Sequence, residues 1–173
     1  MLKHLLPDQY VKNIYEIDVA ELSERGVKAV ITDLDNTLVA WDYPTATVEV
    51  CEWFGALKKA GFQIMVVSNN HEKRVKDFCD PEKVRFIYNA RKPLKRAFQQ
   101  ACKQMAVRPE EAVVVGDQMF TDVLGGNRAG LHTILVVPVV KTDGWMTRMN
   151  RRMERIVLKW MRRKGYITWE DKS

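Results

Sequence analysis

The chain has 173 residues, which is enough for one domain with a substantial hydrophobic core and too few for two ordinary domains. Hydrophobic residues make up 46% and charged residues 29%, a globular composition, and no apolar run reaches the length that crosses a bilayer. The three cysteines are widely separated and odd in number, which argues against a disulfide framework or a zinc site and predicts a cytoplasmic protein with reduced thiols.

The formal net charge of +6 is concentrated at one end of the chain. Residues 141–173 carry the whole excess, so the basic and acidic residues of 1–140 balance. We therefore predict a folded domain over 1–140 and a basic tail over 141–173. In the tail, apolar residues recur at helical spacing opposite a basic face, which predicts an amphipathic helix. Such a helix binds an anionic membrane surface, or it packs on the domain; the sequence leaves both open.

The first 26 residues are predicted to pack around the core and to contribute no chemistry. Residues 7–11 are compatible with a short helix. Asp18 is well placed to cap a second short helix, which Gly26 would end.

The stretch 28–40, KAVITDLDNTLVA, is the one around which the rest of the chain is organised. Residues 29–31 are apolar and mostly β-branched, which is typical of a strand buried on both faces of a parallel sheet. Asp33 and Asp35 follow at once. Because ionised carboxylates are costly to bury, they belong at the carboxyl end of the strand, facing a cation or a substrate. The alternative is that they form only a turn after the strand.

Further strands and helices alternate along the domain. Strands are predicted at residues 63–67, 85–88, 112–115 and 132–137, and helices at residues 46–60, 72–79, 93–105 and from residue 122 to about 129. This alternation produces right-handed crossovers. We therefore predict an α/β fold, a doubly wound, Rossmann-like parallel sheet of five strands with helices on both faces.

Polar residues stand at the carboxyl ends of four of these strands, where ligands bind in such folds. We expect one shared crevice lined by Asp33, Asp35, Ser68, Lys92, Asp117 and Asp122. The loop that follows Asp35 adds Trp41 and Tyr43, either as a hydrophobic lid on the core or as a flap that faces substrate.

Four carboxylates in one crevice repel one another, by roughly 4 kcal/mol for a pair about 4 Å apart at an effective dielectric of about 20. A divalent cation removes that penalty, and oxygen ligands without histidine or cysteine favour Mg²⁺. Lys92 can bind a phosphate oxygen, and Ser68 can donate a hydrogen bond to it. A metal, a cationic clamp and a carboxylate nucleophile together indicate phosphoryl transfer through an aspartyl-phosphate, with Asp35 as the general acid–base.

The order of these motifs resembles the haloacid dehalogenase superfamily of phosphatases over residues 27–138. The shared motifs are D-x-D-x-T at 33–37, a serine after the second strand, Lys92-Pro93, and G-D-x-x-x-x-D at 116–122. The resemblance implies that Asp33 is the nucleophile and Asp35 the acid–base. It also implies a phosphoryl site made of Ser68, Asn69, Lys92 and Thr37. A Mg²⁺ site would be made of Asp33, Asp35, Asp117 and Asp122. Asp35 would offer the metal its main-chain carbonyl.

More closely, the segments DLDNTLV, VVSNN, ARKP and GDQ resemble the YqeG family of bacteria, in subclass IIIA of the superfamily. That family is similar to the mitochondrial phosphatidylglycerophosphate phosphatases. The resemblance implies hydrolysis of a phosphate monoester on a membrane phospholipid such as phosphatidylglycerophosphate. The alternative is a phosphatase of the same superfamily that acts on soluble nucleotides, sugars or nucleic-acid ends.

The spacing of the motifs leaves no room for a cap domain. About 30 residues separate Asp35 from Ser68 and about 20 separate Ser68 from Lys92, enough for one helix and its loops in each interval. An uncapped site suits a phosphate on something large, such as a lipid at the inner face of a membrane, to which the tail would hold the protein peripherally.

Two other classes of protein fit the sequence less well. A response-regulator receiver domain also has a doubly wound sheet and an acidic Mg²⁺ site, but its phosphoacceptor aspartate follows the third strand, which this order of motifs contradicts. A nucleic-acid partner is not expected, because no stacking platform or base-reading motif accompanies the basic charge.

Overall fold

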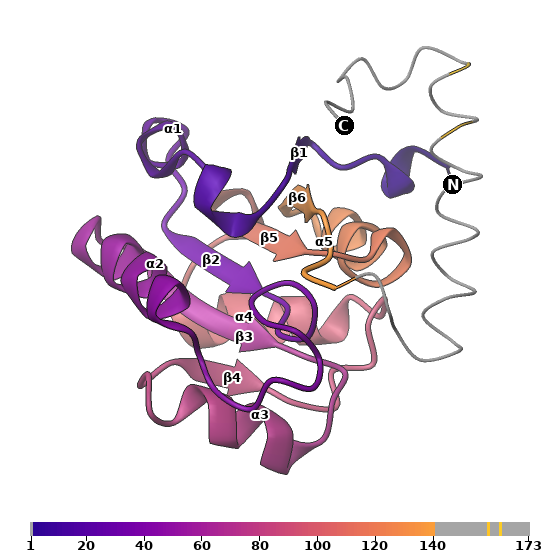
Figure 1. Cartoon of the computed structure of the whole chain (residues 1–173). Helices are drawn as coiled ribbons and strands as arrows, with labels where there is room; N and C mark the ends of the chain where they lie inside the picture. The colour runs from indigo at the N-terminus through magenta and orange to yellow at the C-terminus, as the bar shows by residue number, and fades with distance from the viewer. Residues whose placement is uncertain (1, 141–158, 160–162, 164–173) are drawn as a thin grey trace.

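The computed structural model describes residues 2–140, together with Lys159 and Arg163 (Figure 1). The predicted amphipathic helix of the tail lies outside the described residues, apart from these two, and the division between domain and tail stays a prediction. Within the described part of the chain, no helix has both the length and the apolar character that crossing a bilayer requires.

The centre of the structure is a parallel sheet of six strands, in the order β1-β6-β5-β2-β3-β4 (Figure 1). The strands are β1 (Gln9–Val11), β2 (Ala29–Thr32), β3 (Gln63–Val67), β4 (Arg85–Ile87), β5 (Ala112–Gly116) and β6 (His132–Val136). Every residue of β2 and β5 is buried, as expected for central strands of a sheet that is covered on both faces.

Helices cover both faces, which confirms the predicted doubly wound α/β fold. The α-helices are α1 (Val19–Glu24), α2 (Val48–Lys59), α3 (Glu72–Cys79), α4 (Arg96–Met105) and α5 (Leu124–Ala129). Shorter helical segments are η1 (Leu2–Leu5), η2 (Ile14–Glu16), η3 (Pro109–Glu111) and η4 (Met119–Val123), the last of which is a π-helix. Side chains of α1, α2 and α3 share one core with alternate strand residues, and those of α4 share a second core with the others.

The predicted count of five strands is wrong, because residues 7–11 do not begin a helix. Residues 9–11 form β1, which pairs with residues 134–136 of β6. The amide of Asp8 also donates to the main-chain oxygen of Thr133, at 2.9 Å. Without β1, strand β6 would present a row of unpaired backbone groups at the edge of the sheet. Pairing with β6 therefore explains why residues 9–11 form a strand.

Other predicted elements are confirmed, with small differences at their ends. Helix α4 begins at Arg96 instead of residue 93, because residues 91–94 form a turn in which the amide of Leu94 donates to the oxygen of Arg91. The cap at Asp18 is as predicted, since its side chain accepts hydrogen bonds from two amides of the first turn of α1.

The direction in which the chain adds strands to the sheet reverses between β2 and β5. The chain proceeds from β2 outward through β3 and β4, and from β5 outward through β6 on the other side. Asp33 directly follows β2, and Asp117 directly follows β5. Ligands of doubly wound sheets bind in the crevice at such a reversal, so the fold brings two of the predicted site residues to the position where a site is expected.

Candidate active site

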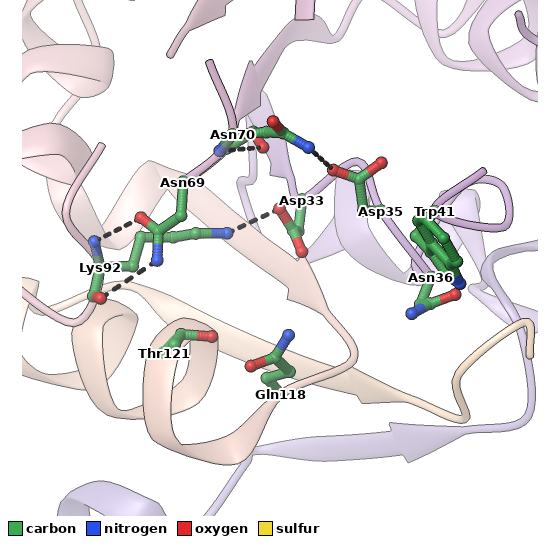
Figure 2. Close-up of a pocket in the computed structure, with 10 residues that line it drawn as sticks. Asp33, Asp35, Asn36, Trp41, Asn69, Asn70, Lys92, Gln118 and Thr121 are labelled. Atoms are coloured by element: carbon green, nitrogen blue, oxygen red, sulfur yellow. Dashed lines mark hydrogen bonds and ion pairs between the residues drawn. The ribbon is translucent and has the colours of Figure 1, made fainter. Parts of the chain in front are cut away.

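Asp33 lies where the buried strand β2 ends. Its amide donates to the main-chain oxygen of Val115 at 2.9 Å, which continues the pairing of β2 with β5 by one residue. Its carboxylate turns into the crevice, where Oδ1 is 2.7 Å from the Nζ atom of Lys92 (Figure 2). Lys92 also pairs with Asp122, again at 2.7 Å. One buried ammonium group therefore bridges a carboxylate from the loop after β2 and a carboxylate from η4.

Asp117 completes a group of three buried carboxylates. Ligand oxygens of Asp33, Asp117 and Asp122 all lie within 4.8 Å of one another. The hydroxyl of Thr37 donates to Oδ1 of Asp117 at 3.2 Å and so fixes its orientation. When all three are ionised, they place three negative charges beside the one positive charge of Lys92. The charge and the oxygen donors fit one hard divalent cation.

The π-helix η4 and Gly116 bring Asp122 into this group. A Cβ atom on Gly116 would lie 2.3 Å from Cγ of Asp122, far inside van der Waals contact, so only glycine permits this approach. The amide of Gln118 donates to Oδ2 of Asp122 at 3.2 Å, while Oδ1 accepts from Lys92. A π-turn of this kind is frequent at functional sites, because it redirects a side chain within a helix.

Burial and the neighbouring charges shift the pKa values of Lys92 and Asp122. Burial alone would lower the pKa of Lys92, but the carboxylates of Asp122 and Asp33 raise that pKa above its ordinary value, so the ammonium group stays charged. Burial and the negative charge of Asp33 raise the pKa of Asp122 above the usual range of a carboxyl group, against the opposing effect of Lys92. Both shifts reflect the negative charge that these carboxylates gather in one buried place.

Asp35 lies outside the group of three and has its own partners. Its Oδ1 accepts from Nη2 and Nε of Arg74, at 2.9 and 3.2 Å, and its Oδ2 accepts from Nδ2 of Asn70 at 2.9 Å. Arg74, on α3, is itself held by the main-chain oxygen of Pro44 and by the ring face of Phe78. Sequence reasoning missed Arg74 and Asn70, although Asn70 stands in the polar segment that follows β3.

Ser68 and Asn69 support the site from the end of β3. The buried hydroxyl of Ser68 accepts from the amide of Asn70 at 3.0 Å. Asn69 binds the main chain of Lys92 twice, since its Oδ1 accepts from the amide at 2.7 Å and its Nδ2 donates to the carbonyl at 3.2 Å (Figure 2). Asn69 thus holds the loop that carries Lys92. The predicted contacts of Asn69 and Thr37 with phosphate stay predictions.

These side chains line an open pocket of about 390 Å³ at the carboxyl edge of the sheet. Its walls are formed by Asp33, Asp35, Asn36, Trp41, Ser68, Asn69, Asn70, Lys92, Gln118 and Thr121 (Figure 2). Trp41 lines this pocket, as a flap that faces substrate would, whereas Tyr43 lines a neighbouring hollow.

The family model of haloacid dehalogenase-like hydrolases matches residues 3–130, which is most of the chain. The chain belongs to this family. It is 54% identical over 169 residues to the probable phosphatase YqeG of Bacillus subtilis, and the match covers 98% of each chain. The protein is a phosphatase of the haloacid dehalogenase type.

Two more distant similarities place this hydrolase among its relatives. It is 30% identical over 177 residues to a phosphatidylglycerophosphate phosphatase of Arabidopsis thaliana, a match that covers 93% of this chain and 49% of the relative. Among solved structures it resembles a 3-deoxy-D-manno-octulosonate 8-phosphate phosphatase of Moraxella catarrhalis in complex with magnesium and phosphate ions. The TM-score is 0.52 at 14% identity, over 68% of this chain and 73% of the other, which supports the fold.

Proposed function

We propose that this phosphatase is a Mg²⁺-dependent phosphomonoester hydrolase that forms a phosphoryl intermediate on Asp33. The observation that carries the proposal is the meeting of three buried carboxylates and one buried ammonium group at the reversal point of the sheet. A carboxylate beside a cationic site is the arrangement that a nucleophilic attack on a phosphate monoester needs.

The residues that would hold Mg²⁺ are the carboxylates of Asp33, Asp117 and Asp122 and the main-chain carbonyl of Asp35. The grouping of the three carboxylates supports this choice of residues, and the magnesium ion in the Moraxella structure of the same fold supports the choice of metal. When bound, Mg²⁺ would neutralise the charge shared by phosphate and carboxylates and so allow the two anions to approach.

The chain's own residues would perform the two chemical steps. A carboxylate oxygen of Asp33 attacks phosphorus, and the bond from phosphorus to the ester oxygen breaks while Asp35 gives that oxygen a proton. Asp35 then takes a proton from water, the water oxygen bonds to phosphorus, and inorganic phosphate leaves with Asp33 restored. Lys92 and Ser68 bind the phosphoryl oxygens through both steps.

We propose a membrane phospholipid, such as phosphatidylglycerophosphate, as the substrate. The similarity to the Arabidopsis enzyme supports this choice, and so does the open pocket, because the described residues 2–140 form no cap domain over it. The basic charge of 141–173 would attract the protein to an anionic membrane surface, where it would act as a peripheral enzyme. Soluble nucleotides, sugars and nucleic-acid ends are the alternative substrates.

The experiment is a comparison of substrates with the full chain. Phosphate release is measured from phosphatidylglycerophosphate in vesicles and from a panel of soluble phosphate monoesters, each with Mg²⁺ and with a chelator. We expect the lipid to have the highest kcat/KM and all activity to require the metal. Turnover of soluble esters without turnover of the lipid would reject the lipid and keep the chemistry.

A further inference from the structure

Among the residues that the structure describes, the large exposed apolar side chains lie on one side of the molecule. In the described part of the chain, eight large apolar residues are exposed: Tyr15, Trp41, Tyr43, Val48, Tyr88, Leu94, Val137 and Val139. All eight lie on the side of the sheet where the strands end, around the pocket of the active site. We call these eight residues the carboxyl rim.

The topology fixes this placement for each of them. The loop after β2 carries Trp41 and Tyr43, and the segment after β6 carries Val137 and Val139. Tyr88 directly follows β4, and Leu94 lies in the turn before α4. The remaining two are Val48, the first residue of α2, and Tyr15, which lines the same hollow as Tyr43 and Val139. At the opposite edge, the residues that the structure describes include no large exposed apolar side chain.

Hollows flank the active-site pocket on both sides within this rim. One, of about 460 Å³, is lined by Tyr15, Tyr43 and Val139 among others. The other, of about 510 Å³, is lined by Tyr88 and Leu94 among others. Single exposed apolar residues are ordinary on a protein surface, but a group that surrounds an active site marks an interaction face.

The composition of the rim favours a lipid surface as the partner. Half of its members are tyrosine or tryptophan, whose rings settle at the boundary between headgroups and acyl chains. The segment 88–96 adds three exposed basic residues, Arg91, Lys95 and Arg96, and contains no acidic residue. These cations complement anionic headgroups.

We infer that the carboxyl rim docks on an anionic phospholipid bilayer, so that the active-site pocket opens onto the headgroups. This inference rests on the proposed function, because docking serves a phosphatase whose substrate is a lipid. The phosphate of a lipid lies in the headgroup layer, and the pocket opens on the same face as the rim. A docked enzyme would therefore reach the phosphate without lifting the lipid out of the bilayer.

The test uses the full chain with Tyr43→Ser, Leu94→Ser and Val139→Ser combined, none of which lines the active-site pocket. Binding is measured by flotation with vesicles of phosphatidylcholine and phosphatidylglycerol. Turnover is measured on phosphatidylglycerophosphate in these vesicles and on p-nitrophenyl phosphate without vesicles. We expect binding and lipid turnover to fall about tenfold or more, and turnover of the soluble ester to stay within about twofold.

A second pair of variants tests the charge with substitutions that leave the core intact. Replacing Arg91, Lys95 and Arg96 with glutamine removes the three exposed cations that adjoin Tyr88 and Leu94 of the rim; we call this the rim charge variant. The matched control replaces three exposed cations in the last turns of α2, α4 and α5, at the opposite edge: Lys59, Lys103 and Arg128. We expect the rim charge variant to lose vesicle binding by about tenfold or more and the control to stay within about threefold of wild type.

The outcomes separate the docking face from the chemistry. Vesicle binding and lipid turnover at wild-type levels in both rim variants would overturn the inference and assign the membrane contact elsewhere, to 141–173 for example. Equal losses in the rim and control charge variants would also overturn it, because attraction would then be a property of the total charge. Failure of wild type on every phosphate ester would instead contradict the proposed function.

Discussion

Arg74 and Asp35 form a nearly enclosed ion pair, in which Nη2 and Nε of the guanidinium lie 2.9 and 3.2 Å from the same carboxylate oxygen. The two side chains are only 12% and 20% exposed. Arg74 comes from α3, one crossover away from the loop that carries Asp35. The pair therefore sets the direction of the carboxylate that we propose as the general acid–base, and Asn70 holds its other oxygen.

Arg74→Lys is expected to lower kcat and leave KM nearly unchanged. Lysine keeps the positive charge but offers one nitrogen where arginine offers two, so Asp35 would lose its fixed direction. General acid–base catalysis contributes about 10²–10⁴ to a rate, and we expect part of this, about tenfold to a hundredfold, to be lost.

The control for this prediction is Lys73→Gln, which alters the neighbouring exposed residue of the same helix. Steady-state kinetics on a soluble phosphate ester supplies the measurement, and circular dichroism verifies the fold. If Arg74→Lys turns over at the wild-type rate, Arg74 does not position Asp35.

Gly116→Ala is expected to displace Asp122 and to abolish most activity. The added Cβ would lie 2.3–2.4 Å from three atoms of the Asp122 side chain, so the carboxylate must move out of the group with Asp33 and Asp117. We expect kcat/KM to fall at least about a hundredfold, in keeping with the precision that a preorganised site requires.

Gly55→Ala is the matched control, because an added Cβ there meets nothing within 4 Å on the exposed side of α2. Alanine favours a helix by up to about 1 kcal/mol over glycine, so this variant should be slightly more stable and fully active. Equal activity of Gly116→Ala and Gly55→Ala would show that the close approach to Asp122 is not needed.

Mg²⁺ is expected to stabilise the folded protein. Its binding to the three carboxylates would add about 2.7 kcal/mol to the free energy of unfolding at a metal concentration of about 100 Kd. Thermal unfolding with Mg²⁺ and with a chelator measures the effect. Asp117→Asn should abolish the rise in Tm, whereas Asp42→Asn, an exposed acid outside the group, should retain it. No change in the wild-type Tm at millimolar Mg²⁺ would argue against the metal site.

Lys92→Met is expected to destabilise the metal-free protein strongly. Removing one partner of a buried ion pair costs about 3–5 kcal/mol, and Lys92 has two partners, Asp33 and Asp122. Urea unfolding in chelator measures this loss. Since Mg²⁺ would balance the freed carboxylates, it should restore more stability to this variant than to wild type. A variant as stable as wild type in chelator would contradict the proposed balance of charges.

The sheet and most of the site could be predicted because their signals are local. Buried parallel strands are short apolar runs, and each ends at a polar residue that cannot be buried without a partner. Asp33 and Asp117 follow two such runs, and parallel strands bring their carboxyl ends to one edge. The group of carboxylates is therefore visible in the sequence, before any distance is known.

The features that escaped prediction depend on contacts between distant residues. Strand β1 has only three residues, and its identity comes from pairing with β6 more than 120 positions away. Arg74 stands among charged residues in the first half of α3, a pattern that equally describes a solvated helix face. The π-turn of η4 spans five residues, too few for hydrophobic periodicity to distinguish it from an α-helix.

The rate of phosphate release by Asp33→Asn tests the central claim most directly, because asparagine keeps the shape of the side chain but replaces the carboxylate with a neutral amide, a far weaker nucleophile. The measurement uses a soluble phosphate ester with Mg²⁺. Circular dichroism verifies that the variant has the wild-type fold. We predict a loss of at least about a thousandfold in kcat. A rate within about tenfold of wild type would contradict the account, since phosphoryl transfer would then not require Asp33.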